Sequence, residues 1–229
     1  MESRAVTRPW QIGFGVVLTA LAGFVDAVGF IRLGGLYTSL MSGNTTQLAV
    51  SLGHGDPLGA VLPALLIGVF LVGAVSGGAI SALCPPRWIT PAVLGFEAVA
   101  LTAALAMAVE HAHVGVASLF LALAMGTQNA VLAHVQGFRA GTTFITGALF
   151  AFGQKAALAL AGRGPRFGWV GDASVWLALL AGAVAGTYAH GHFGIAALAV
   201  PACVAGGLCL AASLFTLLHR SAPVSSIKI

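Results

Sequence analysis

The chain has 229 residues, of which 59% are hydrophobic and 7% are charged, and its mean hydropathy is +0.99. Soluble globular proteins carry about 25% charged residues, so this composition excludes a water-soluble fold and predicts an all-α integral membrane protein. The net charge of +4 is explained by basic cytoplasmic flanks and needs no nucleic-acid partner.

Apolar segments follow one another along the chain and leave no room for a separate soluble domain, because each span needs about 20 residues. The first segment continues past the length of a signal-peptide core and lacks a small-residue cleavage site, so we expect it to be retained as a span. The segments lie at 11–33, 36–52, 58–84, 90–109, 114–136, 142–162, 172–189 and 194–218.

Two of these segments are too polar for a lipid-facing span. Segment 36–52 is rich in Ser, Thr, Asn and Gln, and segment 142–162 contains Thr, Gln and Lys side chains. Non-helical backbone at membrane depth is tolerated where neighbouring protein groups satisfy it. We therefore expect both segments to be re-entrant or broken half-helices, which leaves about six crossings of the bilayer.

The basic residues favour this topology over eight full crossings. With about six crossings, one side receives the N-terminus, Arg87, Arg139, Arg163, Arg166, Arg220 and Lys228, and the other side receives Arg32. Eight crossings would place Arg32, Arg87 and Arg139 outside, which is a weaker asymmetry. By the positive-inside rule the richer side is cytoplasmic, so we expect both termini in the cytoplasm.

Similar motifs recur in the same order in the two halves of the chain. They lie 103, 104 and 109 residues apart and are Asp26-Ala27-Val28 with Asn129-Ala130-Val131, Ser42-Gly43-Asn44 with Thr146-Gly147-Ala148, and Gly73-Ala74-Val75-Ser76-Gly77 with Gly182-Ala183-Val184-Ala185-Gly186. An odd number of crossings per unit predicts inverted repeats, at about 11–110 and 114–218 of a single membrane domain, 1–229. The paired glycines predict close helix contacts, either between the repeats or in a homodimer.

Asp26 lies about four residues beyond the middle of the first segment, where an ionisable group costs several kcal/mol unless it faces protein or a wet cavity. A functional role in proton or cation coupling is the default interpretation at that depth. Its counterpart in the second half is Asn129. The alternative is structural, with the carboxyl bracing an unwound segment near Gly29, Gly34 and Gly35.

The motif Ser42-Gly43-Asn44-Thr45 is typical of a helix start, because glycine permits a strained turn and the polar side chains accept hydrogen bonds from free amides. A second start is expected near Thr146 and Gly147. Two half-helix N-termini that face each other suit an anion or a polar carboxylate. The predicted substrate-binding residues are Ser42, Gly43, Asn44, Thr45, Asn129, Thr146 and Gly147. The alternative is ordinary Ser/Thr packing between helices.

Glu97 is a second carboxyl within an apolar crossing, and it is assigned to proton or cation coupling together with Asp26. Three partners remain open for it, namely Lys155, Gln128 and Gln154. For Lys155, snorkelling of the ammonium to an interface is favoured over pairing inside the membrane.

Histidines gather on the predicted external face, at His54, His111, His113, His190 and His192, together with Asp56 and Glu110. Clustered imidazoles bind zinc or copper and sense pH, but no closed ligand spacing is present, so polar interface residues are the favoured interpretation and no metal site is predicted. The three cysteines have no paired spacing and predict neither a disulfide framework nor a metal site.

The stretches 23–30, 34–37 and 41–45, which read GFVDAVGF, GGLY and MSGNT, resemble the opening signature of the bacterial YoaK family. The stretches 124–130 and 142–147, AMGTQNA and TTFITG, resemble that family's second signature. The resemblance covers nearly the whole chain. It implies a bacterial inner-membrane protein with about six spans and brings no established substrate.

These patterns predict a secondary transporter or permease of a small polar, potentially anionic solute, coupled through Asp26. The alternatives are a non-transporting sensor or partner protein that uses the external histidines, and a channel. No enzyme and no cofactor is expected, because phosphate loops, nucleophile elbows and metalloprotease motifs are absent from the sequence. An acid pair of Asp26 and Glu97 is weak evidence for catalysis.

Overall fold

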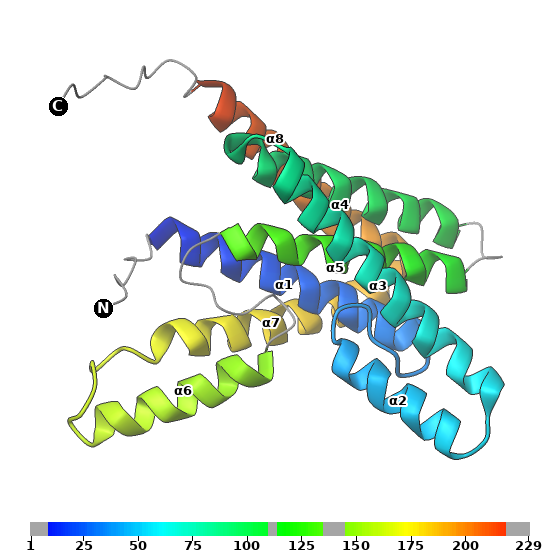
Figure 1. Cartoon of the computed structure of the whole chain (residues 1–229), viewed down its shortest axis with the longest axis horizontal. Coiled ribbons are helices and arrows are strands. Elements are labelled where there is room, and N and C mark those ends of the chain that lie inside the picture. Colours follow the sequence, from blue (N-terminus) through cyan, green and yellow to red (C-terminus); the bar gives the residue numbers. More distant parts are fainter. Residues whose placement is uncertain (1–8, 110–113, 135–144, 219–229) are drawn as a thin grey trace.

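The computed structural model describes residues 9–109, 114–134 and 145–218, and every regular element among them is a helix (Figure 1). The all-α prediction is therefore confirmed. The elements are α1 (Pro9–Arg32), α2 (Met41–Gly53), α3 (Pro57–Leu83), α4 (Pro86–Val109), α5 (Val114–His134), α6 (Ile145–Leu160), α7 (Val170–Phe193), the 3₁₀ turn η1 (Gly194–Leu198) and α8 (Ala199–Leu218).

The long helices have the length and composition of membrane spans. Within the described residues, the stretches long and apolar enough to cross a membrane are Gly13–Arg32, Pro57–Leu83, Pro86–Val109 and Val170–Leu218, and the last of these contains α7, η1 and α8. The apolar part of α5, Gly115–Val131, is shorter. Helices α2 and α6, with 13 and 16 residues, are shorter than the roughly 20 residues that a span needs, as predicted for half-helices.

The outer faces of these helices are apolar. Leu71, Val75 and Val99 are 62%, 64% and 71% exposed, and Leu210 of α8 is 73% exposed. Water would penalise so much exposed apolar surface, whereas lipid chains accept it. The chain is accordingly an integral membrane protein, surrounded by a lipid bilayer.

Helices α1 and α7 approach each other closely through glycines. A Cβ atom at Gly23 would lie 2.2 Å from the carbonyl oxygen of Leu179, and one at Gly182 would lie 1.9 Å from the carbonyl oxygen of Ala20. Since real side chains never come so near to backbone oxygens, only glycine fits at either position.

Helices α3 and α5 form a matching pair. A Cβ atom at Gly126 would lie 2.1 Å from the carbonyl oxygen of Phe70, and one at Gly73 would lie 2.3 Å from the carbonyl oxygen of Leu123. In each pair, the first helix of one half packs on the third helix of the other half. The glycine runs are thus used within one chain, and a homodimer would need another surface.

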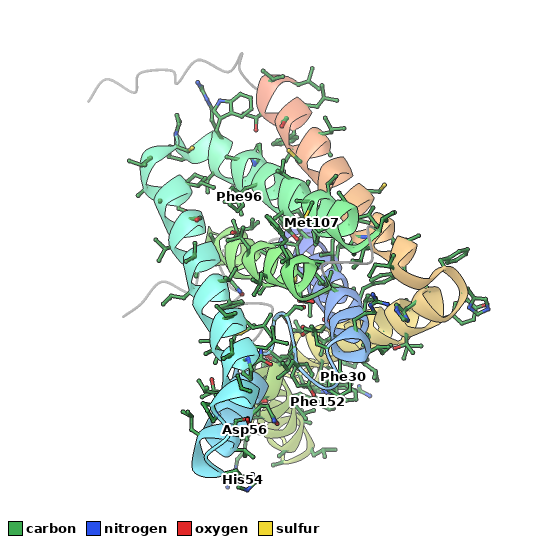
Figure 2. All side chains as sticks on the ribbon, turned by 90° about the vertical axis from the view of Figure 1, so that its right-hand side faces the viewer. Phe30, His54, Asp56, Phe96, Met107 and Phe152 are labelled. Atoms are coloured by element: carbon green, nitrogen blue, oxygen red, sulfur yellow. The ribbon has the colours of Figure 1, made fainter. Side chains whose placement is uncertain are left out.

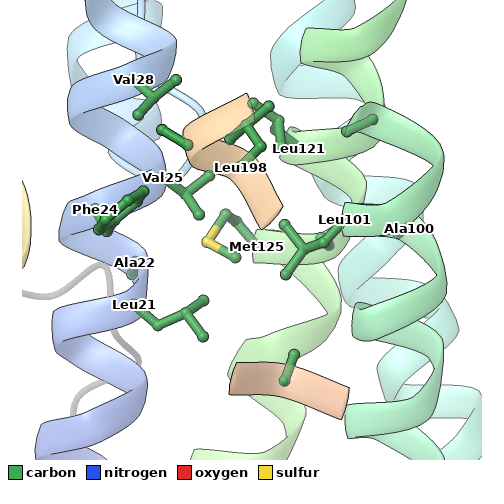
Figure 3. Close-up of a cluster of buried hydrophobic side chains, with 14 residues drawn as sticks. Leu21, Ala22, Phe24, Val25, Val28, Ala100, Leu101, Leu121, Met125 and Leu198 are labelled. Carbon is green, nitrogen blue, oxygen red and sulfur yellow. The ribbon is translucent and has the colours of Figure 1, made fainter. Parts of the chain in front are cut away.

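The centre of the protein is filled by apolar side chains from α1, α4, α5 and η1 (Figure 3). Met125 of α5 is fully buried and lies between Val25 of α1 and Leu101 of α4. Helix α1 is the most enclosed candidate span. In its most apolar 18-residue stretch 61% is buried, compared with 22% for α3. Polar groups on the inner faces of α1, α4 and α5 therefore lie away from lipid.

The two half-helices end in the same way. After α2, Gly55 adopts φ +68°, and after α6, Gly162 also adopts φ +68°. Both turns close with equivalent backbone hydrogen bonds, from His54 to Val50, Gly55 to Leu52 and Asp56 to Ser51, and from Ala161 to Ala157, Gly162 to Ala159 and Arg163 to Leu158. A glycine with positive φ, enclosed by a 6→1 and a 5→2 backbone hydrogen bond, forms a Schellman motif. This motif ends a helix sharply.

Candidate functional site

Asp26 of α1 is 4% exposed, and its carboxylate is saturated with hydrogen bonds. Its Oδ1 accepts from the Thr38 backbone N–H at 2.8 Å, the Thr38 hydroxyl at 2.9 Å and the Ser39 backbone N–H at 2.6 Å. Its Oδ2 accepts from the Ser39 hydroxyl. Every donor belongs to the segment between α1 and α2, so the carboxylate anchors that segment inside the protein, in agreement with the structural interpretation of Asp26.

The chain after α1 turns back into the protein at two glycines. Gly34 and Gly35 have φ values of +63° and +109°, which other residues rarely adopt. The returning chain lies against α1, where a Cβ at Gly29 would sit 2.7 Å from the Thr38 methyl group. These glycines let Thr38 and Ser39 reach back to Asp26, as the sequence predicted for an unwound segment at this place.

Asn44 does not cap α2. The helix begins at Met41, its N-cap residue is Leu40, and no side chain caps it. Instead, the Asn44 side chain pairs with the backbone of Tyr37, accepting from the N–H at 2.9 Å and donating to the C=O at 2.7 Å. The capping role predicted for Asn44 is therefore wrong, because its amide is used to satisfy the preceding loop.

The neighbours of Asn44 are also used differently from the prediction. Gly43 is needed for contact rather than for a strained turn, since a Cβ there would lie 2.7 Å from the Tyr37 ring. Thr45 donates its hydroxyl to the Met41 carbonyl at 2.8 Å, within its own helix. Ser42 is exposed on α2. Of the predicted set on α2, only Asn44 is fully buried.

In the second half, α6 begins at Ile145 in the described residues, as expected near Thr146 and Gly147. Thr146 is exposed and Gly147 is half-buried. The half-buried Asn129 of α5 donates its amide to the Met125 carbonyl at 3.0 Å. Thr142 and Thr143 lie outside the described residues.

The residue before α2 packs near the first turn of α6, although the two helices do not contact each other directly. Leu40, at the start of α2, packs against a cluster that contains Ile145 and Ala148 from the first turn of α6. From there the two helices diverge, α2 toward the lower right and α6 toward the lower left of Figure 1. Their N-termini therefore direct partial positive charge toward the same interior region, where an anion would be stabilised.

Glu97 of α4 and Gln128 of α5 form a fully buried pair. The Gln128 Nε2 donates to Glu97 Oε1 at 2.8 Å, which selects Gln128 from the three partners that the sequence left open. The other two oxygens of the pair, Glu97 Oε2 and Gln128 Oε1, are buried and have no hydrogen-bond partner. Buried polar atoms without partners are rare and call for an explanation.

Lys155 of α6 pairs with Asp172 in the first turn of α7, with 2.6 Å between Nζ and Oδ2. The lysine is 49% exposed, so its ammonium lies at the surface of the protein, and snorkelling to an interface stays a prediction. The pairing with Glu97 that remained open for Lys155 is not formed. The partner Asp172 was not identified from the sequence.

The predicted external histidines are only partly described. Figure 2 shows His54 beside Asp56 at the turn between α2 and α3. His192 stacks on Tyr188, with 4.1 Å between ring centroids, and Nε2 of His190 is buried without a partner. His111, His113 and Glu110 lie outside the described residues. Within the described part of the chain, no group of three or more His, Cys, Asp or Glu side chains could hold a metal, and Cys84, Cys203 and Cys209 are free.

Replacing Asn44 with alanine is expected to lower the free energy of unfolding by about 1–3 kcal/mol, because the partly buried N–H and C=O of Tyr37 lose their partner. The matched control is Thr46→Ala on the same helix, whose exposed hydroxyl only donates to Ser42 O and whose loss should cost less than about 0.5 kcal/mol. Thermal unfolding in detergent measures both. Equal unfolding temperatures for the two variants would contradict a bracing role for Asn44.

Comparison with known proteins identifies the class. A family model described as a protein of unknown function (DUF1275) matches residues 14–211. The UPF0700 transmembrane protein RA0705 of Rhizobium meliloti, strain 1021, is 34% identical over 216 residues, which cover 93% of this chain and 91% of that protein. No solved structure matches. The YoaK family is part of DUF1275, so the resemblance noted from the sequence is confirmed.

Proposed function

We propose that this chain, which belongs to the DUF1275 family, is a secondary transporter of a small polar solute, with anions as the first candidates. The proposal places it in the bacterial inner membrane with both termini in the cytoplasm and includes no enzymatic activity. The observation that carries it is the pair of half-helices α2 and α6, whose starts lie near Leu40 and the cluster around Ile145 and which diverge from there toward the two ends of the molecule (Figure 1).

Half-helices of this kind are suited to binding a solute that must later leave. The first amides of a helix carry partial positive charge, and no side chain caps the start of α2. An anionic group or carboxylate at that place would be stabilised without a permanent counter-charge in the membrane. Discontinuous helices at a repeat interface serve this purpose in secondary transporters. Ser42, Gly43, Asn44, Thr45, Asn129, Thr146 and Gly147 remain the proposed substrate-binding residues.

Asp26 supplies a physical link between a proton and the position of α2. As a carboxylate it accepts four hydrogen bonds from Thr38 and Ser39, directly before α2. Protonation would remove charge from the acceptor and weaken these charge-assisted bonds. Binding of a proton or cation at Asp26 would in this way change how firmly the segment before α2 is held. Coupling requires such a link between ion binding and the position of a structural element. Glu97 is the second group proposed for coupling.

The distribution of charges supports the proposed orientation. Helix α1 begins, and α8 ends, on the side of the protein where α4 and α7 begin (Figure 1). Arg87 lies in the first turn of α4, and Arg163 and Arg166 lie directly before α7. Arg32 ends α1 on the opposite side. Retention of positive charge in the cytoplasm therefore favours cytoplasmic termini.

The test is thermal unfolding of the detergent-purified protein against a panel of small metabolites and anions, for the wild type and Asp26→Asn. A ligand at a hundredfold excess over its dissociation constant should stabilise the folded protein by about 2.7 kcal/mol. We expect a stabilising solute whose effect is weaker in Asp26→Asn, and saturable, coupled uptake of that solute into vesicles that contain the protein.

Two other results would replace the proposal. Flux of the solute without saturation or coupling would indicate a channel. No response to any solute, together with a clear shift by zinc or copper, would indicate a sensor that uses the histidines. Thr46→Ala is the control variant, since its exposed hydroxyl bonds only within α2.

A further inference from the structure

The two carboxyl groups that are buried in the described part of the chain have different surroundings. Asp26 is 4% exposed and meets four hydrogen-bonding groups, two backbone N–H donors and two hydroxyls. Such a site stabilises a negative charge. Glu97 is 0% exposed and meets one donor, the amide of Gln128. A charged carboxylate with a single neutral donor, deep in a membrane protein, would lose far more hydration energy than that bond returns.

Within residues 9–109, 114–134 and 145–218, no positive charge compensates Glu97. Among the described residues it forms no ion pair, and α3 and η1 carry no ionisable side chain. Helix α8 contributes only Cys203 and Cys209, and the Cys209 thiol donates to the Pro91 carbonyl. On α5 the ionisable residue is His134, the last of the helix. Arg87 on α4 itself is ten residues away, which is about 15 Å along the helix.

The two buried oxygens without hydrogen-bond partners indicate that Glu97 carries a proton. If Glu97 is charged, its Oε2 can only accept a hydrogen bond, and the amide oxygen Oε1 of Gln128 is also an acceptor. Both oxygens lack a donor. A proton on Oε2 turns that oxygen into a donor, and the amide oxygen of the same pair is the acceptor without a donor. Carboxylic acids and primary amides join in this way through two parallel hydrogen bonds. One proton on Oε2 would give both oxygens a partner, whereas a charged Glu97 leaves both without one.

We infer that Glu97 holds a proton in the folded protein and shares it with Gln128, so that this pair is a neutral acid–amide site for proton binding in the membrane interior. The inference rests on the geometry of the pair and holds whether or not the protein transports a solute. It also divides the roles of the carboxyls, since the hydrogen bonds of Asp26 anchor the segment before α2.

Infrared spectroscopy of the purified protein in lipid nanodiscs tests the inference directly. A protonated carboxyl group has a C=O stretching band separate from the amide bands, and this band moves to lower frequency in D₂O. We expect such a band in the wild type, its loss in Glu97→Gln, and its retention in Asp26→Asn. A wild-type spectrum without the band, or a band that survives in Glu97→Gln, would overturn the inference.

The exchanged variant Glu97→Gln with Gln128→Glu provides the second test. It carries the same acid and amide with their positions swapped, so the band should return and the unfolding temperature should stay close to that of the wild type. A folded double variant without the band would refute the inference. A sodium titration that raises the unfolding temperature of the wild type and not of Glu97→Gln would also refute it, because it would reveal a charged Glu97 with a bound cation.

These experiments use no solute, so their result is independent of the ligand panel. A protonated Glu97 in a protein that binds no solute would leave the proton site standing and remove the transporter. A coupled transporter with a charged Glu97 would support the proposed function and remove the proton site.

Discussion

Replacing Asp26 with alanine is expected to lower the free energy of unfolding by roughly 2–6 kcal/mol, because the backbone N–H groups of Thr38 and Ser39 are left buried without an acceptor at about 1–3 kcal/mol each. The effect should be local before it is global. Amide hydrogen exchange over residues 33–44 should accelerate while α4 and α8 remain protected, and thermal unfolding in detergent should measure the total loss.

Asparagine at the same position distinguishes the contribution of the negative charge from that of the hydrogen-bond acceptors. Its carbonyl oxygen can replace Oδ1, which accepts three of the four bonds, and its amide can donate to the Ser39 hydroxyl once that hydroxyl rotates. Asp26→Asn should therefore cost less than Asp26→Ala by at least about 1 kcal/mol. Equal losses in the two variants would show that the charge, rather than the pattern of acceptors, holds the segment.

The comparison also decides what Asp26 does in a transporter. If coupling depends on its charge, Asp26→Asn keeps the fold and loses the dependence of uptake on the ion gradient. If Asp26 only braces the chain, Asp26→Asn transports with normal coupling. The structural and functional interpretations are compatible, because the group that holds the segment before α2 is also the group whose charge could release it.

Local patterns in the sequence predicted most of the helix bounds. The segment expected at 11–33 is α1, Pro9–Arg32, and the polar segment expected at 142–162 contains α6, Ile145–Leu160. Segment 36–52 was correctly separated from the spans, but its helix begins only at Met41. The preceding residues are pulled out of helical geometry by Asp26, which lies in another element, and hydropathy carries no trace of that contact.

The candidate site was predictable as a set of polar residues and not as a set of contacts. Asp26, Asn44 and Glu97 stand out because polar groups are costly in a membrane. Their partners lie on a returning loop or on a neighbouring helix, and only the packed chain brings them together. Thr38 and Ser39 follow two glycines, which signals a turn, but nothing in their spacing points to Asp26. Gln128 was one of several amides equally available to Glu97.

The glycine runs illustrate the same limit. Their spacing predicted close helix contacts, yet it could not select a contact between repeats over a homodimer. The choice follows from the crossing of α1 over α7 and of α3 over α5, where the glycines face backbone oxygens of the other half of the chain.

Gly182→Ala is expected to destabilise the protein by about 3 kcal/mol relative to Gly191→Ala on the same helix. The added methyl group at Gly182 would lie 1.9 Å from the Ala20 carbonyl oxygen, so α1 and α7 must move apart, and overpacking of this kind costs about 1–3 kcal/mol or more. At Gly191 nothing lies within 4 Å, and alanine should stabilise the helix by up to about 1 kcal/mol.

The pair of α3 and α5 allows a second, independent form of this prediction. Gly126 of α5 meets the Phe70 carbonyl oxygen of α3 at 2.1 Å, whereas Gly115 of α5 has open space around it. Gly126→Ala should therefore lower the unfolding temperature about as much as Gly182→Ala, and Gly115→Ala should leave it unchanged or raised. If Gly182→Ala and Gly191→Ala unfold at the same temperature, α1 and α7 are not in contact at these glycines. If alanine lowers the unfolding temperature at only one of the two interfaces, the two halves of the chain do not pack in the same way. The proposal that α2 and α6 are matching half-helices would then lose its structural basis.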